Sequence, residues 1–223
     1  MVNRDPSPRQ VRLDYEEASL CVATKQNLPV PEASSDRAFF DVVGSRRSCR
    51  SFGALTDEQL GSLFWYTAKT TRTLGSWQGR ATPSAGGIHP VDVLIVDHCD
   101  EGVRLRMYDS MSHALSTVRI DNKPAAHSLF ERLNGVVEIQ NGAAIVFAAQ
   151  FDKTRAVYEN ADNLVWRDAG ALLYAFYAVC EGVGLNCCGI GITCSSEVAE
   201  ALGSPLYEGV GGCVIGSKQA GET

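Results

Sequence analysis

The sequence lacks the spacings that mark a metal-dependent protein and the long apolar runs that mark a membrane protein. Its four histidines form no H-E-x-x-H pattern and its eight cysteines form no C-x-x-C pair, so no metal site is predicted. The longest apolar run, Ala169 to Cys180, spans 12 residues, whereas a membrane-spanning helix needs about 20. The first residues are charged and interrupted by proline, without the apolar stretch of a signal peptide.

An excess of positive charge is also missing. The chain has 20 Lys and Arg against 26 Asp and Glu, a formal net charge of -6, which argues against a nucleic-acid-binding protein. Several cysteines lie in apolar stretches, where a thiol behaves as a small hydrophobic group. We therefore expect reduced cysteines in a cytoplasmic protein, with a vicinal Cys187–Cys188 disulfide as the disfavoured alternative.

Nucleotide-binding and hydrolase motifs are absent as well. No G-x-x-x-x-G-K-[ST] sequence occurs, so no P-loop is predicted, and no G-x-S-x-G nucleophile elbow is present. The G-x-G pairs that begin at Gly182, Gly189 and Gly209 lack the third glycine and the long helix of a dinucleotide-binding fold.

The 223 residues suffice for one sizeable domain. Residues 1–35 are polar and rich in proline and predict an extended arm, with a helical turn expected near Tyr15 to Val22. Residues 36–223 predict the compact domain, whose class is α+β: a mixed sheet flanked by helices, without regular β-α alternation. The capping box Thr56 to Gln59 predicts a helix from Asp57 to about Lys69.

The longest predicted helix, Asp162 to Gly182, is apolar nearly all round from Ala169 to Cys180. A helix that is apolar on every side must be covered on every side. In a domain of this size the pattern indicates either the domain centre or an interface between two copies of the chain.

The basic segment from Arg46 to Phe52 predicts a phosphate site. Arg46, Ser48 and Arg50 occupy alternate positions, so an extended backbone would place them on one side. Two guanidinium groups flanking a hydroxyl suit a phosphate monoester. The alternative is a solvated basic turn after a short helix over Asp36 to Ser45.

The loop from Pro83 to Pro90 is the second candidate site. It contains Ser84, Ala85, Gly86 and Gly87, and two glycines allow a backbone to approach a flat ligand closely. The alternative is a plain turn that leads into the strand at Val91.

Taken together, three segments resemble the nitroreductase superfamily of flavoproteins. They are the R-R-S-x-R-x-F segment at 46–52, the capped helix T-D-E-Q-L-G-S-L-F-W at 56–65, and P-S-A-G-G-I-H-P at 83–90. The resemblance is to the SagB-type (McbC-type) branch, which includes azoline dehydrogenases that act on modified peptides. Asp168-Ala169-Gly170 resembles the start of that branch's long apolar helix.

This resemblance implies a homodimer that binds FMN at the subunit interface. Arg46, Ser48 and Arg50, together with Lys218, would hold the phosphate and ribityl end. In the family pattern the second subunit donates Pro83, Ser84, Ala85 and Gly86, which would line the flavin ring, with Gly189 and Gly191 near it.

The family's catalytic Lys-Tyr pair is only half present. The matching position reads Val157-Tyr158, so Tyr158 is the candidate catalytic residue, although a structural tyrosine is an equal alternative. We expect a SagB-type dehydrogenase or oxidase acting on an organic, peptide-derived or other small-molecule substrate. The alternatives are an NAD(P)H-dependent nitro, quinone or flavin reductase, and a non-catalytic flavin-binding or degenerate partner subunit.

Overall fold

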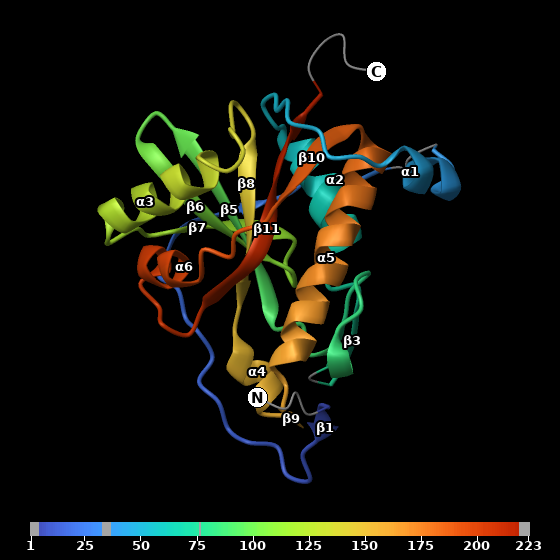
Figure 1. The fold of residues 1–223 in the computed structure, drawn as a ribbon, viewed down its shortest axis with the longest axis vertical. Helices are drawn as coiled ribbons and strands as arrows, with labels where there is room; N and C mark the ends of the chain where they lie inside the picture. The colour runs from blue at the N-terminus through green and yellow to red at the C-terminus, as the bar shows by residue number, and fades with distance from the viewer. Residues whose placement is uncertain (1–4, 33–36, 76, 219–223) are drawn as a thin grey trace.

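The computed structural model describes residues 5–32, 37–75 and 77–218, and its central feature is a sheet of seven strands (Figure 1). The strand order is β10-β11-β8-β5-β6-β7-β2, and each neighbouring pair is antiparallel. The bounds are β2 Val22–Asn27, β5 Val91–Cys99, β6 Gly102–Asp109, β7 Ala114–Val118, β8 Ala143–Ala149, β10 Leu185–Ile190 and β11 Glu208–Ser217. The predicted α+β class is confirmed, with an antiparallel rather than a mixed sheet.

Helices cover both faces of this sheet. One face packs against α2 (Asp57–Thr67) and α5 (Asp162–Val183), and the other packs against α3 (Lys123–Asn134) and α6 (Ser195–Leu202). Two short helices, α1 (Phe39–Ser45) and α4 (Phe151–Arg155), flank the two ends of α5 (Figure 1). Strand β8 is buried along its whole length, as a continuous apolar run requires when both faces are covered.

The capping box at the start of α2 forms as predicted. The Thr56 side chain accepts the backbone N–H of Gln59, and the Gln59 side chain accepts the backbone N–H of Thr56. These bonds satisfy two donors that helix geometry leaves open. Helix α5 ends at Gly184, whose φ of 76° is the left-handed conformation of a glycine cap.

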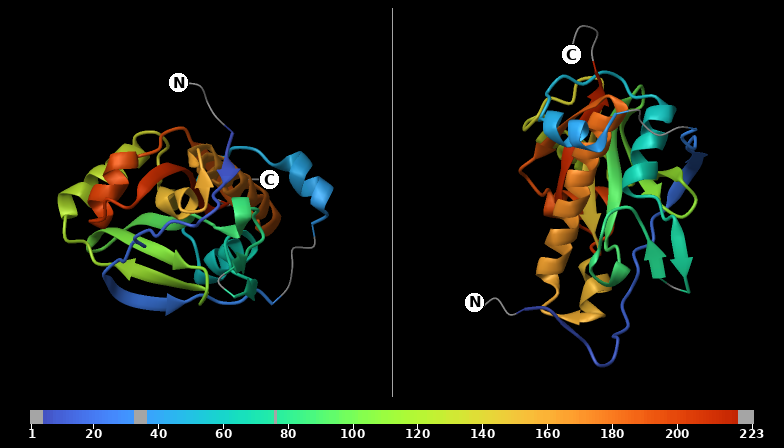
Figure 2. Two further views of the ribbon diagram at one scale, coloured as in Figure 1. Left: turned by 90° about the horizontal axis from the view of Figure 1, so that it is seen from below. Right: turned by 90° about the vertical axis from the view of Figure 1, so that its right-hand side faces the viewer.

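The N-terminal arm is extended, and the expected helical turn near Tyr15 to Val22 does not form. The arm's β1 (Ser7–Pro8) pairs with β9 (Tyr158–Glu159), and its β2 completes the large sheet. Figure 2 shows the arm running along the outside of the domain between these two pairings. The division of the chain at residue 35 stays a prediction, while residues 22–27 contribute a strand to the domain's sheet.

Residues 70–90, which are rich in Thr, Gly, Ser and Pro, contain short regular elements. A hairpin of β3 (Arg72–Leu74) and β4 (Trp77–Gly79) precedes a 3-10 turn, η1, over Ala85–Gly87. The sequence did not predict these two strands, because three residues are too few to show the alternation of apolar and polar side chains that marks a strand.

Candidate functional site

The C-terminal end of α5 lies at the top in Figure 1, and hydrogen bonds and ring contacts bring a group of site residues together there. We call Arg46, Ser48, Arg50, Tyr177 and Gly189 the upper cluster. The segment after α1 runs beside β10, where Cys49 N–H donates to Cys187 O at 3.0 Å. The Ser48 hydroxyl lies 2.8 Å from the Tyr177 hydroxyl, which also accepts the Gly189 N–H at 2.6 Å. Tyr177 thus ties the basic segment to both α5 and β10.

The upper cluster contains two positively charged side chains, Arg46 and Arg50. The Arg46 guanidinium carbon lies 5.0 Å from the centre of the Tyr177 ring, a cation–π contact. Burial raises the pKa of Cys188 on β10, and the positive charge of Arg50 partly offsets that rise. Within the part of the chain that the structure describes, neither Arg46 nor Arg50 forms an ion pair.

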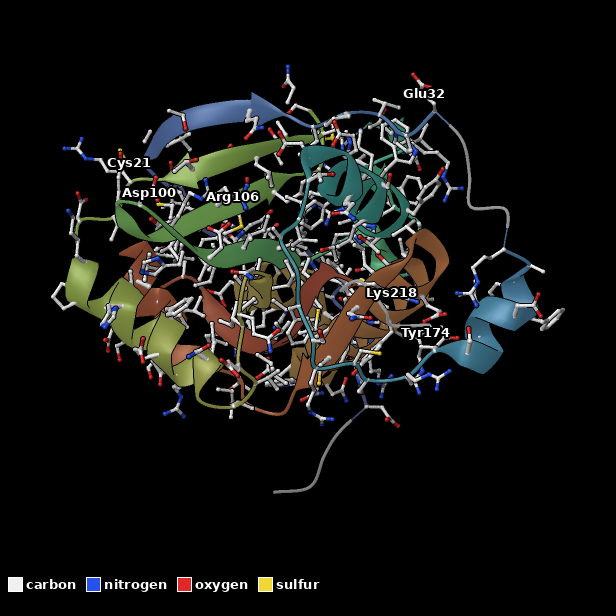
Figure 3. All side chains as sticks on the ribbon, turned by 90° about the horizontal axis from the view of Figure 1, so that it is seen from above. Cys21, Glu32, Asp100, Arg106, Tyr174 and Lys218 are labelled. Carbon is white, nitrogen blue, oxygen red and sulfur yellow. The ribbon has the colours of Figure 1, made fainter. Side chains whose placement is uncertain are left out.

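Lys218 lies near this cluster at the end of β11 (Figure 3). Its positive charge helps to lower the pKa of Glu181 at the end of α5. Burial opposes that lowering, but the bonds that Glu181 accepts from Arg37 and Ser45 outweigh it. These contacts hold α1 against the end of α5 and so place the basic segment that follows α1.

The second cluster is the glycine loop, Pro83 to Gly87, near the lower part of α5. The Ser84 hydroxyl donates to Asp168 Oδ2 at 2.6 Å, and Ala85 N–H donates to Asp168 Oδ1 at 3.2 Å. Ser84 Oγ also accepts the His89 N–H at 2.9 Å. Burial raises the pKa of Asp168, and the bonds from Ser84 and Ala85 oppose that rise. One carboxylate therefore shapes the loop, and the Ser84 hydroxyl is occupied in holding it.

Gly86 and Gly87 both require the left-handed backbone, with φ of 63° and 65°, which glycine adopts without a steric penalty. A Cβ on Gly86 would lie 2.9 Å from the Tyr158 hydroxyl oxygen, and one on Gly87 would overlap the indole nitrogen of Trp77. The loop thus presents bare backbone between two aromatic side chains.

Tyr158 therefore lies beside the glycine loop. It is half-buried on β9, the strand that pairs with the N-terminal arm. Lys153, one turn away in α4, forms an ion pair with Glu17 of the arm at 3.1 Å. Val157 occupies the position of the missing lysine and lines the same cavity as Lys153.

The two clusters do not meet within one chain. Asp168 and Tyr177 are nine positions apart on α5, which separates the loop anchor from the upper cluster by about 13 Å along the helix axis. The structure brings Arg46, Ser48, Arg50 and Gly189 together at one end, and the glycine loop and Tyr158 together at the other. Gly191 follows β10 and is exposed.

Sequence reasoning missed Tyr177 and Trp77. Tyr177 sits in an apolar run that reads as helix core, and only its hydroxyl distinguishes it from its neighbours. Trp77 lies in the β3–β4 hairpin, which the sequence did not predict. The one available signal was that a buried tyrosine hydroxyl needs a hydrogen-bond partner.

Comparisons with known proteins identify the family. The sequence profile of the Nitroreductase family matches residues 43–217. A nitroreductase homologue from Methanocaldococcus jannaschii is 24% identical over 166 residues, which cover 73% of this chain and 82% of that protein. The chain belongs to the nitroreductase family, whose members are FMN-dependent oxidoreductases.

Solved structures support the fold. A nitroreductase homologue from Ralstonia eutropha superimposes with a TM-score of 0.68 at 21% identity, covering 96% of this chain and 99% of that one. The Escherichia coli microcin synthetase McbBCD complex matches with a TM-score of 0.56 at 16% identity, covering 88% and 79%. A Bacteroides fragilis nitroreductase with bound FMN matches with a TM-score of 0.52 at 13% identity, covering 84% and 91%. Among the described residues no helix is long and apolar enough to cross a membrane.

Proposed function

We propose that this chain is an FMN-dependent two-electron oxidoreductase that acts as a SagB-type dehydrogenase or oxidase on an organic substrate. The observation that carries the proposal is the upper cluster, where Arg46 and Arg50 flank Ser48 along β10 and form no ion pair with any residue that the structure describes. Cations held in place without a counter-charge suit a dianionic phosphate. A solvated basic turn, the alternative interpretation, does not account for the bonds that tie Ser48 to Tyr177 and Tyr177 to Gly189.

The residues present fit the other parts of FMN as well. Arg46, Ser48, Arg50 and Lys218 would hold the phosphate and ribityl end. The bare backbone of Pro83 to Gly86 would lie against the flat ring, with Gly189 and Gly191 near it. FMN, when bound, supplies the acceptor or donor of a hydride. Because the Ser84 hydroxyl is engaged by Asp168 and His89, Ser84 acts here by fixing the loop.

A homodimer would complete this site. The two clusters lie at opposite ends of α5, so an antiparallel pairing of two α5 helices about a two-fold axis would bring one copy's upper cluster to the other copy's glycine loop. The outer face of α5 is apolar but uncovered, with Trp166 47% and Tyr174 50% exposed. Figure 3 shows Tyr174 on the side of α5 where α1 lies, and Phe40 of α1 is 83% exposed. These surfaces suit burial against a second copy.

Tyr158 is the proposed proton partner in catalysis. The supporting observation is the position of its hydroxyl beside Gly86, in the loop that would line the ring. Tyrosine serves as a general acid or base when it lies within hydrogen-bond reach of the reacting group.

A reductase fed by NAD(P)H is the second candidate, and one observation favours it. Val157 replaces the lysine of the dehydrogenase pair, and Lys153, the nearest lysine in the chain, is engaged by Glu17. A paired lysine is a poor base, so the proton abstraction that a dehydrogenase requires depends on Tyr158 alone.

The eight free cysteines support a reducing compartment, and we place the protein in the cytoplasm. Three of them, Cys180, Cys187 and Cys213, belong to one core cluster. They remain reduced there as hydrophobic side chains.

Two measurements test the proposal. Denatured protein should release FMN rather than FAD, since the upper cluster suits a terminal phosphate. Stopped-flow mixing of oxidised enzyme with NADH or NADPH should leave the flavin yellow if the protein is a dehydrogenase, and bleach it within seconds if it is a reductase. A flavin that cannot be photoreduced, or no flavin at all, would instead support the non-catalytic partner subunit.

A further inference from the structure

A cavity of about 420 Å³ lies beside the glycine loop, on the side where Trp77 and Tyr158 are found. Four segments that are distant in sequence form its walls: the N-terminal arm, the hairpin strand β4 and the residue that follows it, the glycine loop, and α4 with the residues after it. The residues that matter for its chemistry are Arg12, Tyr15, Trp77, Arg80 and Lys153. The proposed mechanism assigns none of them a role.

Arg80 is the feature of this cavity that most needs a ligand. Its Nε is fully buried and has no hydrogen-bond partner, and Arg80 forms no ion pair within the described ranges. Burial lowers the pKa of Arg80, although an arginine stays charged at any pH a protein tolerates. The residue as a whole is half-buried, and removing part of a charged group from water carries a cost that a ligand's counter-charge would offset.

Burial lowers the pKa of Arg80, and the negative charge of Asp92 partly opposes that lowering from beyond ion-pair distance. Asp92 accepts bonds from Gln150 at 2.8 Å and from Tyr207 at 3.3 Å, and it makes no ion pair with Arg80. His89, which also lines the cavity, is buried; burial and the Arg80 charge lower its pKa to about 4. His89 is therefore neutral near pH 7 and adds no charge of either sign.

The whole cavity is cationic in a chain of net charge -6. Arg12, Arg80 and Lys153 line it, and Glu17 is the carboxylate among its lining residues. Because Glu17 is engaged by Lys153 at 3.1 Å, Arg12 and Arg80 remain for a ligand. Two aromatic side chains, Tyr15 and Trp77, provide flat apolar surface beside them.

We propose that this cavity is the substrate pocket and that it selects an aromatic or planar organic carboxylate, with Arg80 binding the acid group. This inference rests on the proposed function, because the glycine loop that forms one wall is the loop assigned to the flavin ring. An acid group held by Arg80 would leave the planar part of the substrate beside Trp77 and the glycine loop. A guanidinium group matches a carboxylate with two parallel hydrogen bonds, which also fixes the orientation of the substrate.

The N-terminal arm acquires a role in this proposal. It contributes Arg12 and Tyr15 to the cavity, and the Arg12 guanidinium carbon lies 5.9 Å from the centre of the Tyr15 ring. Backbone bonds from Arg9 N–H to Val157 O at 2.8 Å and from Leu13 N–H to Ala156 O at 2.9 Å hold the arm in place. The arm thus forms the outer wall of the pocket.

Calorimetric titration of the purified, flavin-loaded protein tests the proposal with matched probes. Benzoate and 2-naphthoate carry the acid group, and benzamide and 2-naphthamide have nearly the same shape without the charge. We expect at least one carboxylate to bind about tenfold or more tightly than its amide, since charged hydrogen bonds are the strong ones. Equal binding of acid and amide, or no binding of either acid, would overturn the proposal.

Variants connect the preference to Arg80. Arg80→Met should abolish it, and Arg80→Lys should restore part of it. Arg119→Met is the matched control, because Arg119 is an exposed residue outside the cavity. If Arg80→Met does not fold, Arg12→Gln on the exposed arm should weaken carboxylate binding severalfold and leave amide binding unchanged. A preference that survives in the folded Arg80 variant, or in Arg12→Gln when the former does not fold, would contradict the assignment.

The flavin content separates this inference from the proposed function. If the wild-type protein holds FMN but binds acids and amides equally, the proposed carboxylate pocket is refuted and the proposed function is not. Wild-type protein without FMN refutes the proposed function, and the titration still decides whether the cavity binds carboxylates.

Discussion

The two ends of α5 carry different chemistry on one helix. At the upper end Tyr177 uses its hydroxyl to join a basic segment to β10, and the cationic groups nearby are the half-buried Arg46 and the exposed Arg50 and Lys218. At the lower end Asp168 uses its carboxylate to hold a glycine loop whose exposed surface is backbone. The first arrangement presents charge, and the second presents a flat surface.

This separation of charge and flat surface on one helix is the reason for proposing a site shared by two copies of the chain. FMN has a charged end and a flat end, and α5 holds the complement of each about 13 Å apart along its axis. In the proposed homodimer, the charged end of FMN would bind to one copy and its flat end to the glycine loop of the other. The predictions below test each end of α5 and then the surface between them.

The largest effect is expected at the upper end. Replacing both Arg46 and Arg50 with alanine removes charged hydrogen bonds that contribute about 1.5–3 kcal/mol each, so FMN affinity should fall on the order of a hundredfold or more. Fluorescence titration of the apoprotein with FMN measures this change. Arg47→Ala is the control, because Arg47 is exposed and its Nε donates only to Ser45 O. An unchanged affinity in the double variant would mean that the segment is a solvated turn.

The next effect is on turnover and belongs to the lower end. Tyr158→Phe should slow turnover by about a hundredfold if Tyr158 is the proton partner, while the FMN content stays that of the wild type. Steady-state kinetics and the flavin absorbance per chain provide the two readouts. Tyr66→Phe, a half-buried tyrosine on α2, serves as the control. Normal turnover in Tyr158→Phe would return Tyr158 to a structural role.

The surface between the two ends is tested by Tyr174→Glu. A carboxylate introduced into an apolar interface must be desolvated. We therefore expect the dissociation constant of the dimer to rise about tenfold or more. Sedimentation at micromolar concentration should show twice the 24.0 kDa chain mass for the wild type and a monomer fraction for the variant. Val136→Glu, at an exposed position outside α5, should stay dimeric. A wild type that is monomeric with FMN bound would refute the shared site.

A smaller effect is expected from Asp168→Ala, which removes the acceptor for Ser84 and Ala85. Hydrogen bonds to a charged group contribute about 1.5–3 kcal/mol, so the free energy of unfolding should fall by about that amount. Urea unfolding measures it, with the exposed Asp152→Ala as the comparison. A destabilised variant that still binds the FMN phosphate normally would show that the upper cluster does not depend on the glycine loop. Unchanged stability would show that the loop does not depend on Asp168.

The smallest effect is a pH dependence from His89. Burial and the Arg80 charge lower its pKa from the ordinary 6.5 to about 4, so between these values the unfolded chain binds a proton that the folded chain does not. Stability therefore rises with pH through this window and is lost as pH falls. Between pH 6 and pH 5 the His89 contribution should be on the order of 1 kcal/mol. His89→Asn should flatten the curve of unfolding free energy against pH over that range, and an unchanged slope would contradict the shift.

Much of the fold was predictable because its elements carry local signals. Three features depend only on residues close together in the sequence: the capping box of α2, the apolar run of β8 and the glycine after α5. The arm was harder to predict. Strand β2 is exposed along its length, so its only reason to be a strand is pairing with β7, which lies far along the chain.

The candidate site divides in the same way. The sequence alone determined that Gly86 and Gly87 can present bare backbone, and it predicts that Arg46, Ser48 and Arg50 share one side of an extended segment, because both depend on backbone geometry at neighbouring residues. Only the tertiary structure decided that Asp168 shapes the glycine loop, that Tyr177 ties the basic segment to β10, and that Arg80 lines a cavity without forming an ion pair among the described residues. These relations join residues that are distant in sequence, and packing rather than local propensity brings them together.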